Sequence, residues 1–247
     1  MAGYAEKDQF IKVGDVKLDV SIIEPKQETK GSALFLHGGG EISSKETYLP
    51  LARAFAGQGY RCLIFSFPGH GKSGGKITGS SLAKRTEIAR ALAKELGFLP
   101  STLLLGFSMG VHNALRLLSA SHDPFPRLAL FVPAIYSAEA EDIEFSPKFS
   151  EIIRRPGSYE NSLVLRNLRE YRGKLAVFQA GKDKVIPPEV IDLISKNAVS
   201  ASSNDKVYFK DSPHGIGDWI CENEKRLTSV VKALDTFDFS ELKQFTF

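Results

Sequence analysis

The segment Gly-Phe-Ser-Met-Gly at residues 106–110 constrains the fold more than any other part of the chain. A short apolar run typical of a buried strand precedes it, and residues 111–115 continue with helical character. In a sharp turn from strand to helix the middle residue takes a strained backbone conformation, and glycines on either side relieve the crowding. The pattern therefore predicts that Ser108 stands above a sheet at the N-terminus of a helix, as an exposed nucleophile.

Apolar runs alternate with segments of helical period along the rest of the chain. The first two predicted strands flank Gly14 and Asp15 and indicate an antiparallel hairpin. The predicted strands are residues 9–13, 16–23, 32–36, 61–65, 101–106, 128–135, 175–180 and 206–209. The predicted helices include residues 49–58, 80–96, 109–119 and 219–234. This alternation indicates an α/β fold, with helices on both faces of an eight-stranded, mostly parallel sheet.

One connection, residues 137–174, is too long for a simple crossover. It contains Pro147, Pro156 and two helix-like pieces, residues 148–154 and 163–171. We interpret it as a small cap over the carboxyl edge of the sheet, although an ordinary crossover helix with an irregular entry fits the same residues. The chain is otherwise expected to form a single domain over residues 1–247.

Charge and hydropathy exclude several classes of partner. The 32 Lys and Arg residues nearly balance the 29 Asp and Glu residues and are scattered, so neither a nucleic acid nor an anionic membrane is expected as a partner. No stretch approaches the roughly 20 apolar residues that span a bilayer, and the N-terminus lacks the apolar core of a secretory signal. Two cysteines in a chain of this size are expected to stay reduced, which favours a cytoplasmic location.

A serine hydroxyl needs a base to remove its proton, and a histidine commonly serves. Five are present: His37, His70, His112, His122 and His214. In this kind of fold the base follows the nucleophile on the loop after the last strand. His122 precedes the next strand, whereas His214 lies just after residues 206–209 and is the predicted base. His112 lies four residues after Ser108 on the helix flank and is expected to be structural or on the surface.

The acid that orients the base is predicted to be Asp183. It follows the strand at residues 175–180 and precedes His214 by enough residues for one helix and one strand. Asp205 and Asp211 are rivals, although both lie close to His214 along the chain. A helix-capping role is the alternative for Asp183.

Two backbone amides are predicted to form an oxyanion hole, which a tetrahedral intermediate requires. The Met109 N–H directly follows the nucleophile, and Gly39 belongs to a run of three glycines after His37. The glycine run on its own is also compatible with a simple turn. The glycine-rich residues 68–75 lack phosphate-loop spacing and are interpreted as a brace for this loop. No Cys or His cluster has zinc spacing, so no metal is expected.

Together these residues resemble the α/β-hydrolase superfamily, and within it the serine-aminopeptidase-like and cinnamoyl-esterase-like hydrolases. The motifs match in order at residues 37–38, 69–74, 106–110, 183–187 and 214. The family's usual aspartate three residues before Gly69 is Ser66 here, which weakens the assignment to a subfamily.

The resemblance implies that a small carboxylic ester is cleaved through an acyl-enzyme on Ser108, without a cofactor. An acyl-thioester hydrolase or a peptidase using the same triad stays open, as does a non-catalytic interaction protein on a hydrolase scaffold. The partner implied is a small-molecule acyl substrate. In the cap, Phe145, Phe149 and Ile152 are predicted to line the substrate pocket, or else to anchor the cap. The physiological substrate and the oligomeric state are left open.

Overall fold

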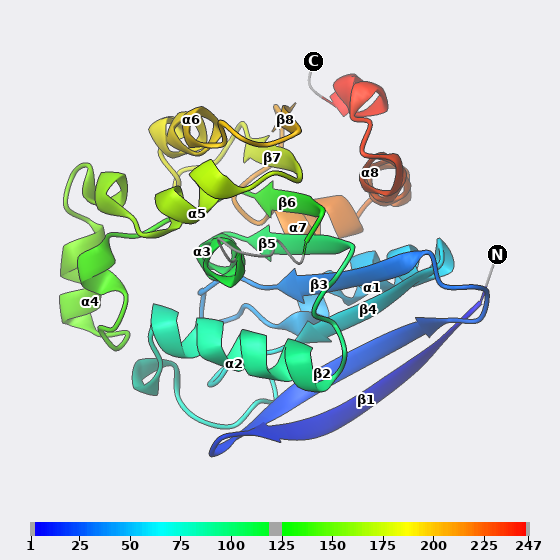
Figure 1. The fold of residues 1–247 in the computed structure, drawn as a ribbon, viewed down its shortest axis with the longest axis horizontal. Coiled ribbons are helices and arrows are strands. Elements are labelled where there is room, and N and C mark those ends of the chain that lie inside the picture. The colour runs from blue at the N-terminus through cyan, green and yellow to red at the C-terminus, as the bar shows by residue number, and fades with distance from the viewer. Residues whose placement is uncertain (1–2, 119–124, 246–247) are drawn as a thin grey trace.

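A computed structural model describes residues 3–118 and 125–245. They form one eight-stranded sheet with helices on both faces, so the predicted α/β-hydrolase architecture is confirmed (Figure 1). In spatial order the strands are β1 (Tyr4–Val13), β2 (Val16–Pro25), β4 (Tyr60–Phe65), β3 (Gly31–Leu36), β5 (Leu103–Phe107), β6 (Arg127–Phe131), β7 (Lys174–Ala180) and β8 (Ser203–Phe209). β2 pairs antiparallel with both β1 and β4, and the other neighbours pair in parallel.

The sheet separates two hydrophobic cores because successive side chains of a strand point to opposite faces. In β3, Leu34 and Leu36 enter one core, while Ala33 and Phe35 enter the other. The first core is covered by α2 (Leu82–Glu95), α3 (Met109–Leu117), α5 (Val164–Glu170) and α6 (Pro188–Asn197). The second is covered by α1 (Leu49–Gly57), α7 (Ile216–Cys221) and α8 (Glu224–Thr236). No helix of the described residues is long and apolar enough to cross a membrane.

Several elements differ from the prediction: β1 begins at Tyr4 and not at residue 9, and β8 begins at Ser203 and not at residue 206. β6 ends at Phe131 and not at residue 135, because Val132 has a φ of +43° and its N–H donates to the carbonyl of Phe178. The single helix predicted at residues 219–234 is two helices, α7 and α8. The Asn223 side chain accepts a hydrogen bond from the N–H of Arg226 and starts α8 as its N-cap.

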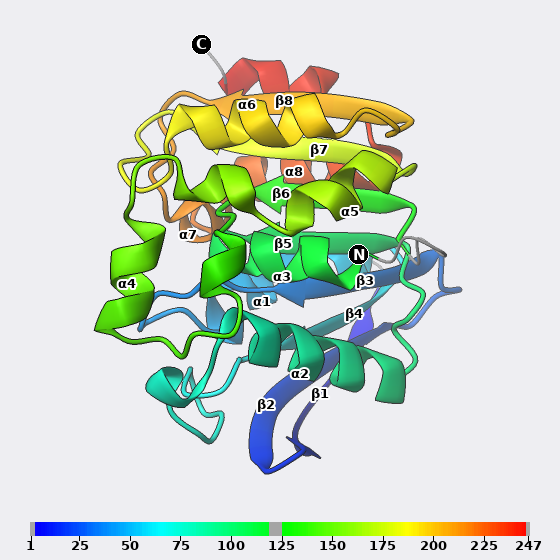
Figure 2. The same ribbon diagram turned by 60° about the vertical axis from the view of Figure 1, so that its left-hand side comes forward.

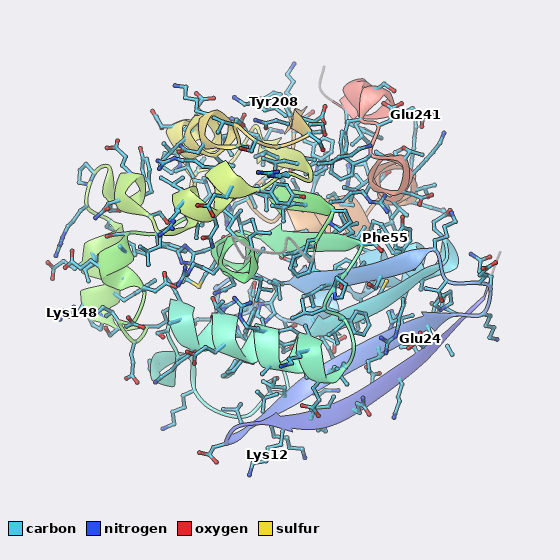
Figure 3. All side chains as sticks on the ribbon, in the orientation of Figure 1. Lys12, Glu24, Phe55, Lys148, Tyr208 and Glu241 are labelled. Carbon is cyan, nitrogen blue, oxygen red and sulfur yellow. The ribbon has the colours of Figure 1, made fainter. Side chains whose placement is uncertain are left out.

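The long connection between β6 and β7 contains two helices that pack differently. α4 (Pro147–Ile153) lies beyond the carboxyl ends of β5 and β6, toward which the arrows of these strands point (Figures 1 and 2). It belongs to a separate small cluster of buried residues: Leu82, Ala140, Phe145, Phe149 and Ile152. Lys148 points away from that cluster to the solvent (Figure 3). In contrast, α5 packs against α3 and α6 in the helical layer of the sheet.

Short 3-10 helices complete the described elements. They are η1 (Lys45–Tyr48), η2 (Ile77–Gly79), η3 (Ala138–Ala140), η4 (Ser158–Asn161) and η5 (Ser240–Phe245). Of these, η1 is joined to the glycine loop at residues 38–40 by residues 41–44, so its anchoring affects the predicted oxyanion hole.

Candidate active site

The turn between β5 and α3 holds Ser108 in a strained conformation, with φ 49° and ψ −119°. Positive φ is uncommon for residues other than glycine. The flanking glycines allow close backbone contact: a Cβ on Gly110 would lie 2.1 Å from the carbonyl oxygen of Leu36, and one on Gly106 would lie 2.8 Å from the Cα of Val111. The predicted strand–turn–helix geometry is therefore confirmed.

Three predicted residues meet at the carboxyl edge of the sheet. The Nε2 atom of His214, on the loop after β8, lies 3.0 Å from the Oγ of Ser108. The Nδ1 atom of His214 lies 2.9 Å from Oδ2 of Asp183, on the loop after β7. The Asp183 side chain is 7% exposed and the His214 side chain 27%, so the acid is shielded while the base stays accessible.

Hydrogen bonds fix the ionised form of Asp183. Its second oxygen, Oδ1, accepts from the backbone N–H groups of Val185 at 2.7 Å and Ile186 at 3.1 Å. Burial would raise the pKa of Asp183, but these bonds and the one from His214 hold the pKa below its ordinary value. An ionised acid accepts from Nδ1–H of His214, which leaves Nε2 free to accept the proton of Ser108.

The loops that carry the acid and the base are tied together. The N–H of Lys182 donates to the carbonyl of Ser212 at 2.9 Å, next to Asp183 on one loop and close to His214 on the other. The rival Asp211 forms an ion pair with Lys182 and its side chain is 65% exposed. The other rival, Asp205, lies within β8 and pairs with Ala176 of β7. Asp183 is thus the carboxylate that reaches His214.

Two other described histidines, His37 and His70, form hydrogen bonds with backbone groups. His37 is 1% exposed; its Nε2 accepts from the N–H of Phe67 at 2.8 Å, and its Nδ1 lies 2.7 Å from the carbonyl of Gly38. The Nδ1 of His70 lies 3.0 Å from the carbonyl of Ser43. Burial lowers the pKa of both rings, that of His70 to about 4, so both are neutral at pH 7. They brace the glycine loop, as the sequence predicted for residues 68–75.

His112 is fully buried and connects α3 with the long connection. Its Nε2 lies 2.9 Å from Glu141, and its Nδ1 accepts from the N–H of Tyr136. Arg116 donates to the other oxygen of Glu141. This pairing confirms the prediction of a structural His112. His122 lies outside the described residues.

The glycine loop passes directly over the nucleophile turn. A Cβ on Gly38 would lie 3.3 Å from the Cβ of Ser108, and one on Gly39 would lie 2.6 Å from the Sδ of Met109. Within the described residues, neither the Gly39 N–H nor the Met109 N–H donates to a protein acceptor. Both predicted oxyanion donors therefore lie beside Ser108 with unused N–H groups.

Ser66, at the position where the resemblance implies an aspartate, contacts Lys45. The Oγ of Ser66 accepts from the backbone N–H of Lys45 at 3.1 Å, at the start of η1. The Lys45 side chain is buried and donates to Asp8, Asp19 and Ser21 in the N-terminal hairpin. The start of η1 is thus anchored by the hydrogen bonds and ion pairs of Lys45, a residue that the sequence analysis did not identify.

Arg85 is a second residue that the sequence analysis missed. Its guanidinium is 1% exposed and donates to the carbonyls of His37 at 2.8 Å and Gly38 at 3.1 Å. It lies on α2 at helical spacing from Leu82 and Ala89, which are both buried. A charged residue on the apolar face of a predicted helix was the signal that could have found it.

A cavity of about 630 Å³ lies next to the loops of the triad, although Ser108, Asp183 and His214 do not themselves line it. The N–H of Ala134 in its wall donates to the carbonyl of Ser108, and two other wall residues supply the N–H groups that hold Asp183. Its lining includes Ala134, Tyr136, Ile153, Tyr159, Val185 and Ile186. The predicted pocket residues Phe145, Phe149 and Ile152 do not line this cavity; they lie in the buried cluster under α4, against which Met109 and Tyr136 pack.

The described residues offer no alternative centre based on a metal or a disulfide. No group of three or more His, Cys, Asp or Glu side chains in them is arranged to hold a metal ion. Cys62 and Cys221 are both free thiols.

Comparisons with known proteins agree with the fold. A family model described as "Serine aminopeptidase, S33" matches residues 27–155, just over half of the 247 residues. A search of curated proteins gives no match.

Among solved structures, Est1E from Butyrivibrio proteoclasticus with bound ferulic acid is 17% identical, with a TM-score of 0.69 over 95% of this chain and 99% of its own. An esterase from Pyrococcus furiosus is 23% identical, with a TM-score of 0.65 over 94% of this chain and 93% of its own. A thioesterase domain from the curacin biosynthetic pathway is 16% identical, with a TM-score of 0.68 over 93% and 99%. At these identities the structures share the fold. With the family match, they establish that the chain belongs to the serine aminopeptidase S33 family of α/β-hydrolases.

Proposed function

We propose that the protein is a serine hydrolase that cleaves a small carboxylic ester through an acyl-enzyme on Ser108. The observation that carries the proposal is the continuous hydrogen-bonded chain from Ser108 to His214 to Asp183, at 3.0 and 2.9 Å. A base within 2.6–3.2 Å of a hydroxyl, itself oriented by a carboxylate, is the geometry that activates a serine.

In the first half-reaction, Oγ of Ser108 attacks the ester carbonyl carbon while Nε2 of His214 takes the hydroxyl proton. The carbonyl oxygen becomes an oxyanion and accepts hydrogen bonds from the N–H groups of Met109 and Gly39. Asp183 stabilises the imidazolium that forms. His214 then gives its proton to the leaving alcohol oxygen, and the acyl group stays on Ser108.

In the second half-reaction, water takes the place of the alcohol. His214 removes one of its protons as the water oxygen attacks the acyl carbon, and the same two N–H groups hold the second oxyanion. When the intermediate collapses, Oγ of Ser108 leaves and regains a proton from His214. The carboxylic acid is released and the enzyme is regenerated.

The cavity beside the triad supplies the substrate pocket in this proposal. Part of its wall is apolar or aromatic, with Tyr136, Tyr159 and Ile186, and suits an apolar acyl or alcohol group; Arg154, Arg155 and Glu189 also line the cavity. Residues 137–174 act as a small cap on the single domain of residues 1–247. Within the cap, Ile153 of α4 forms part of the pocket wall.

The buried cluster of Phe145, Phe149 and Ile152 holds α4 in place from behind. These residues therefore act on the substrate through the position of the wall. Of the two roles that the sequence left open, this assignment keeps cap anchoring and drops direct lining of this cavity.

Treatment with a fluorophosphonate probe, combined with p-nitrophenyl butyrate hydrolysis, tests the proposal. We expect the wild-type enzyme to be labelled at one site per chain and to hydrolyse the ester, and Ser108→Ala to do neither. Mass spectrometry of the labelled peptide locates the adduct.

Ser101→Ala is a matched control, because this serine is buried, lies before β5 and donates a hydrogen bond to the carbonyl of Phe98. It is expected to be labelled and active. An unlabelled wild-type enzyme, or equal labelling of Ser108→Ala, would contradict the proposal. Faster turnover of butyryl-CoA than of p-nitrophenyl butyrate would change the proposed substrate class from an ester to a thioester. Ser108 would remain the proposed nucleophile.

A further inference from the structure

Arg85 is a buried cation without an acidic partner. In the part of the chain that the structure describes, its hydrogen bonds from nitrogen to oxygen go to two backbone carbonyls, and its Nε has no partner. Charged side chains are rarely fully buried unless they are paired. Burial lowers the pKa of Arg85 to about 9, so the group keeps its charge at pH 7. Burying a charge without an acidic partner lowers stability, so a role in function would account for its presence.

The two carbonyls belong to the glycine loop that carries a predicted oxyanion donor. The carbonyl of Gly38 and the N–H of Gly39 are parts of one peptide group, and in a trans peptide they point in opposite directions. Arg85 lies 3.1 Å from this carbonyl oxygen, and Nδ1 of His37 lies 2.7 Å from it. Arg85 therefore fixes the plane of the peptide and directs the Gly39 N–H away from itself.

A charged donor on the carbonyl also strengthens the N–H of the same peptide. Hydrogen bonds in a chain polarise one another, and a low local dielectric increases the effect. The Arg85 guanidinium lies over the Phe67 ring at 3.8 Å and is fully buried, so water screens its charge little.

Contacts link Arg85 to the nucleophile turn as well. Its Nη1 lies 3.4 Å from the Sδ of Met109, the residue directly after Ser108. The same sulfur would lie 2.6 Å from a Cβ on Gly39. The cation, Met109 and the glycine loop are therefore in mutual contact.

We propose that Arg85 is a positioning residue for ester hydrolysis, which orients and polarises the Gly38–Gly39 peptide so that the Gly39 N–H binds the oxyanion. This inference rests on the proposed function. In the free enzyme the guanidinium interacts with backbone dipoles alone, and in the tetrahedral intermediate a net negative charge also lies on the far side of the Gly38–Gly39 peptide. Arg85 thus stabilises the transition state more than the bound ester, and its loss lowers kcat more than it raises KM.

The test compares Arg85→Met, which keeps the apolar stem and removes the charge, with Arg85→Lys, which keeps a charge. Arg90→Met is the matched control, because Arg90 lies on the same helix and donates to the Arg116 carbonyl at the surface. The readouts are kcat and KM for p-nitrophenyl butyrate, and the inhibition constant of phenylboronic acid, which forms a tetrahedral adduct on an active serine.

Removing one oxyanion donor lowers kcat by about 100- to 1,000-fold in other hydrolases, which sets the upper limit for Arg85. For Arg85→Met we expect kcat to fall about 10- to 100-fold, KM to change less than about twofold, and boronate affinity to fall by the same factor as kcat. Arg85→Lys should recover part of both losses, and Arg90→Met should match the wild type.

A loss of kcat in Arg85→Met with unchanged boronate affinity would overturn the inference, as would a rise in KM equal to the fall in kcat. If Arg85→Met shows no thermal unfolding transition, the same comparison is made with Arg85→Lys, for which parallel partial losses are expected and wild-type values would overturn the inference. A wild-type enzyme that neither hydrolyses the ester nor reacts with a fluorophosphonate would refute the proposed function itself. Complete but slower labelling of Arg85→Met would keep the proposed function and support the role of Arg85.

Discussion

Asp183 divides its two carboxylate oxygens between different tasks. One oxygen holds His214, and the other holds the backbone of its own loop through the N–H groups of Val185 and Ile186. The orientation of the base therefore depends on a carboxylate that is itself fixed on both sides. A residue that only capped a helix would not connect to the base in this way.

Replacement of this carboxylate should uncouple the base from the nucleophile. We expect Asp183→Asn to lower kcat by roughly 10,000-fold, because an amide does not hold the imidazole in the tautomer that accepts from Ser108. Asp211→Asn is the control, since Asp211 is an exposed partner of Lys182, and its kcat should stay within about twofold of the wild type. Near-normal kcat in Asp183→Asn would move the acid role to another residue. Steady-state kinetics on p-nitrophenyl butyrate decide between these results.

At the level of elements, the nucleophile turn is a junction of β3, β5 and α3. Gly110 brings α3 against the carbonyls of Leu36 and His37, at the end of β3. The same strand end starts the glycine loop. The position of Ser108 and the position of its predicted oxyanion donors are thus set by one close contact.

A methyl group at Gly110 should disturb both the position of Ser108 and that of the predicted oxyanion donors. We expect Gly110→Ala to lower the free energy of unfolding by about 1–3 kcal/mol and to slow fluorophosphonate labelling, because the new Cβ would overlap a backbone carbonyl that has no room to move. Gly79→Ala serves as the control, since a Cβ there meets nothing within 4 Å and should change stability by less than about 0.5 kcal/mol. Urea denaturation measures the difference. Equal stability of the two variants would show that the junction tolerates a shift of α3.

On the scale of the whole molecule, buried histidines connect the loops at the carboxyl edge. His37 and His70 brace the glycine loop, and His112 joins α3 to the connection that carries α4. Burial lowers the pKa of all three rings, so the native protein keeps them neutral. In the unfolded chain they titrate near their ordinary pKa of about 6.5.

Stability should therefore fall as the pH decreases from about 7 to about 5. In that range the unfolded chain binds protons that the native protein does not, and each such histidine contributes up to about 1.4 kcal/mol per pH unit to the slope. The carboxylates with lowered pKa, such as Asp183, lose their contribution only at lower pH. We expect His70→Gln to show a shallower fall than the wild type in urea denaturation over this range. An unchanged slope would mean that His70 takes up its proton in the native state.

Much of this arrangement was predictable because it depends on local sequence. Side-chain periodicity indicates strands and helices, and the glycines around Ser108 indicate a strained turn. The order of Ser108, Asp183 and His214 along the chain is the order typical of the family that the motifs resemble. The end of β6 was not predictable in this way, because Val132 leaves the strand through a bond to Phe178 of the neighbouring strand.

The sequence by itself thus determined the α/β fold, the nucleophile turn and the members of the candidate triad. Only the tertiary structure decided what supports them: the bond of Ser66 to the backbone of Lys45, the ion pairs of Lys45 with the N-terminal hairpin, and the bonds of Arg85 to the glycine loop. The physical reason is that a buried charge is stable only through acceptors brought to it by the fold. For Arg85 these acceptors are the carbonyls of His37 and Gly38, nearly fifty residues away in the chain, and no local pattern records such a pairing.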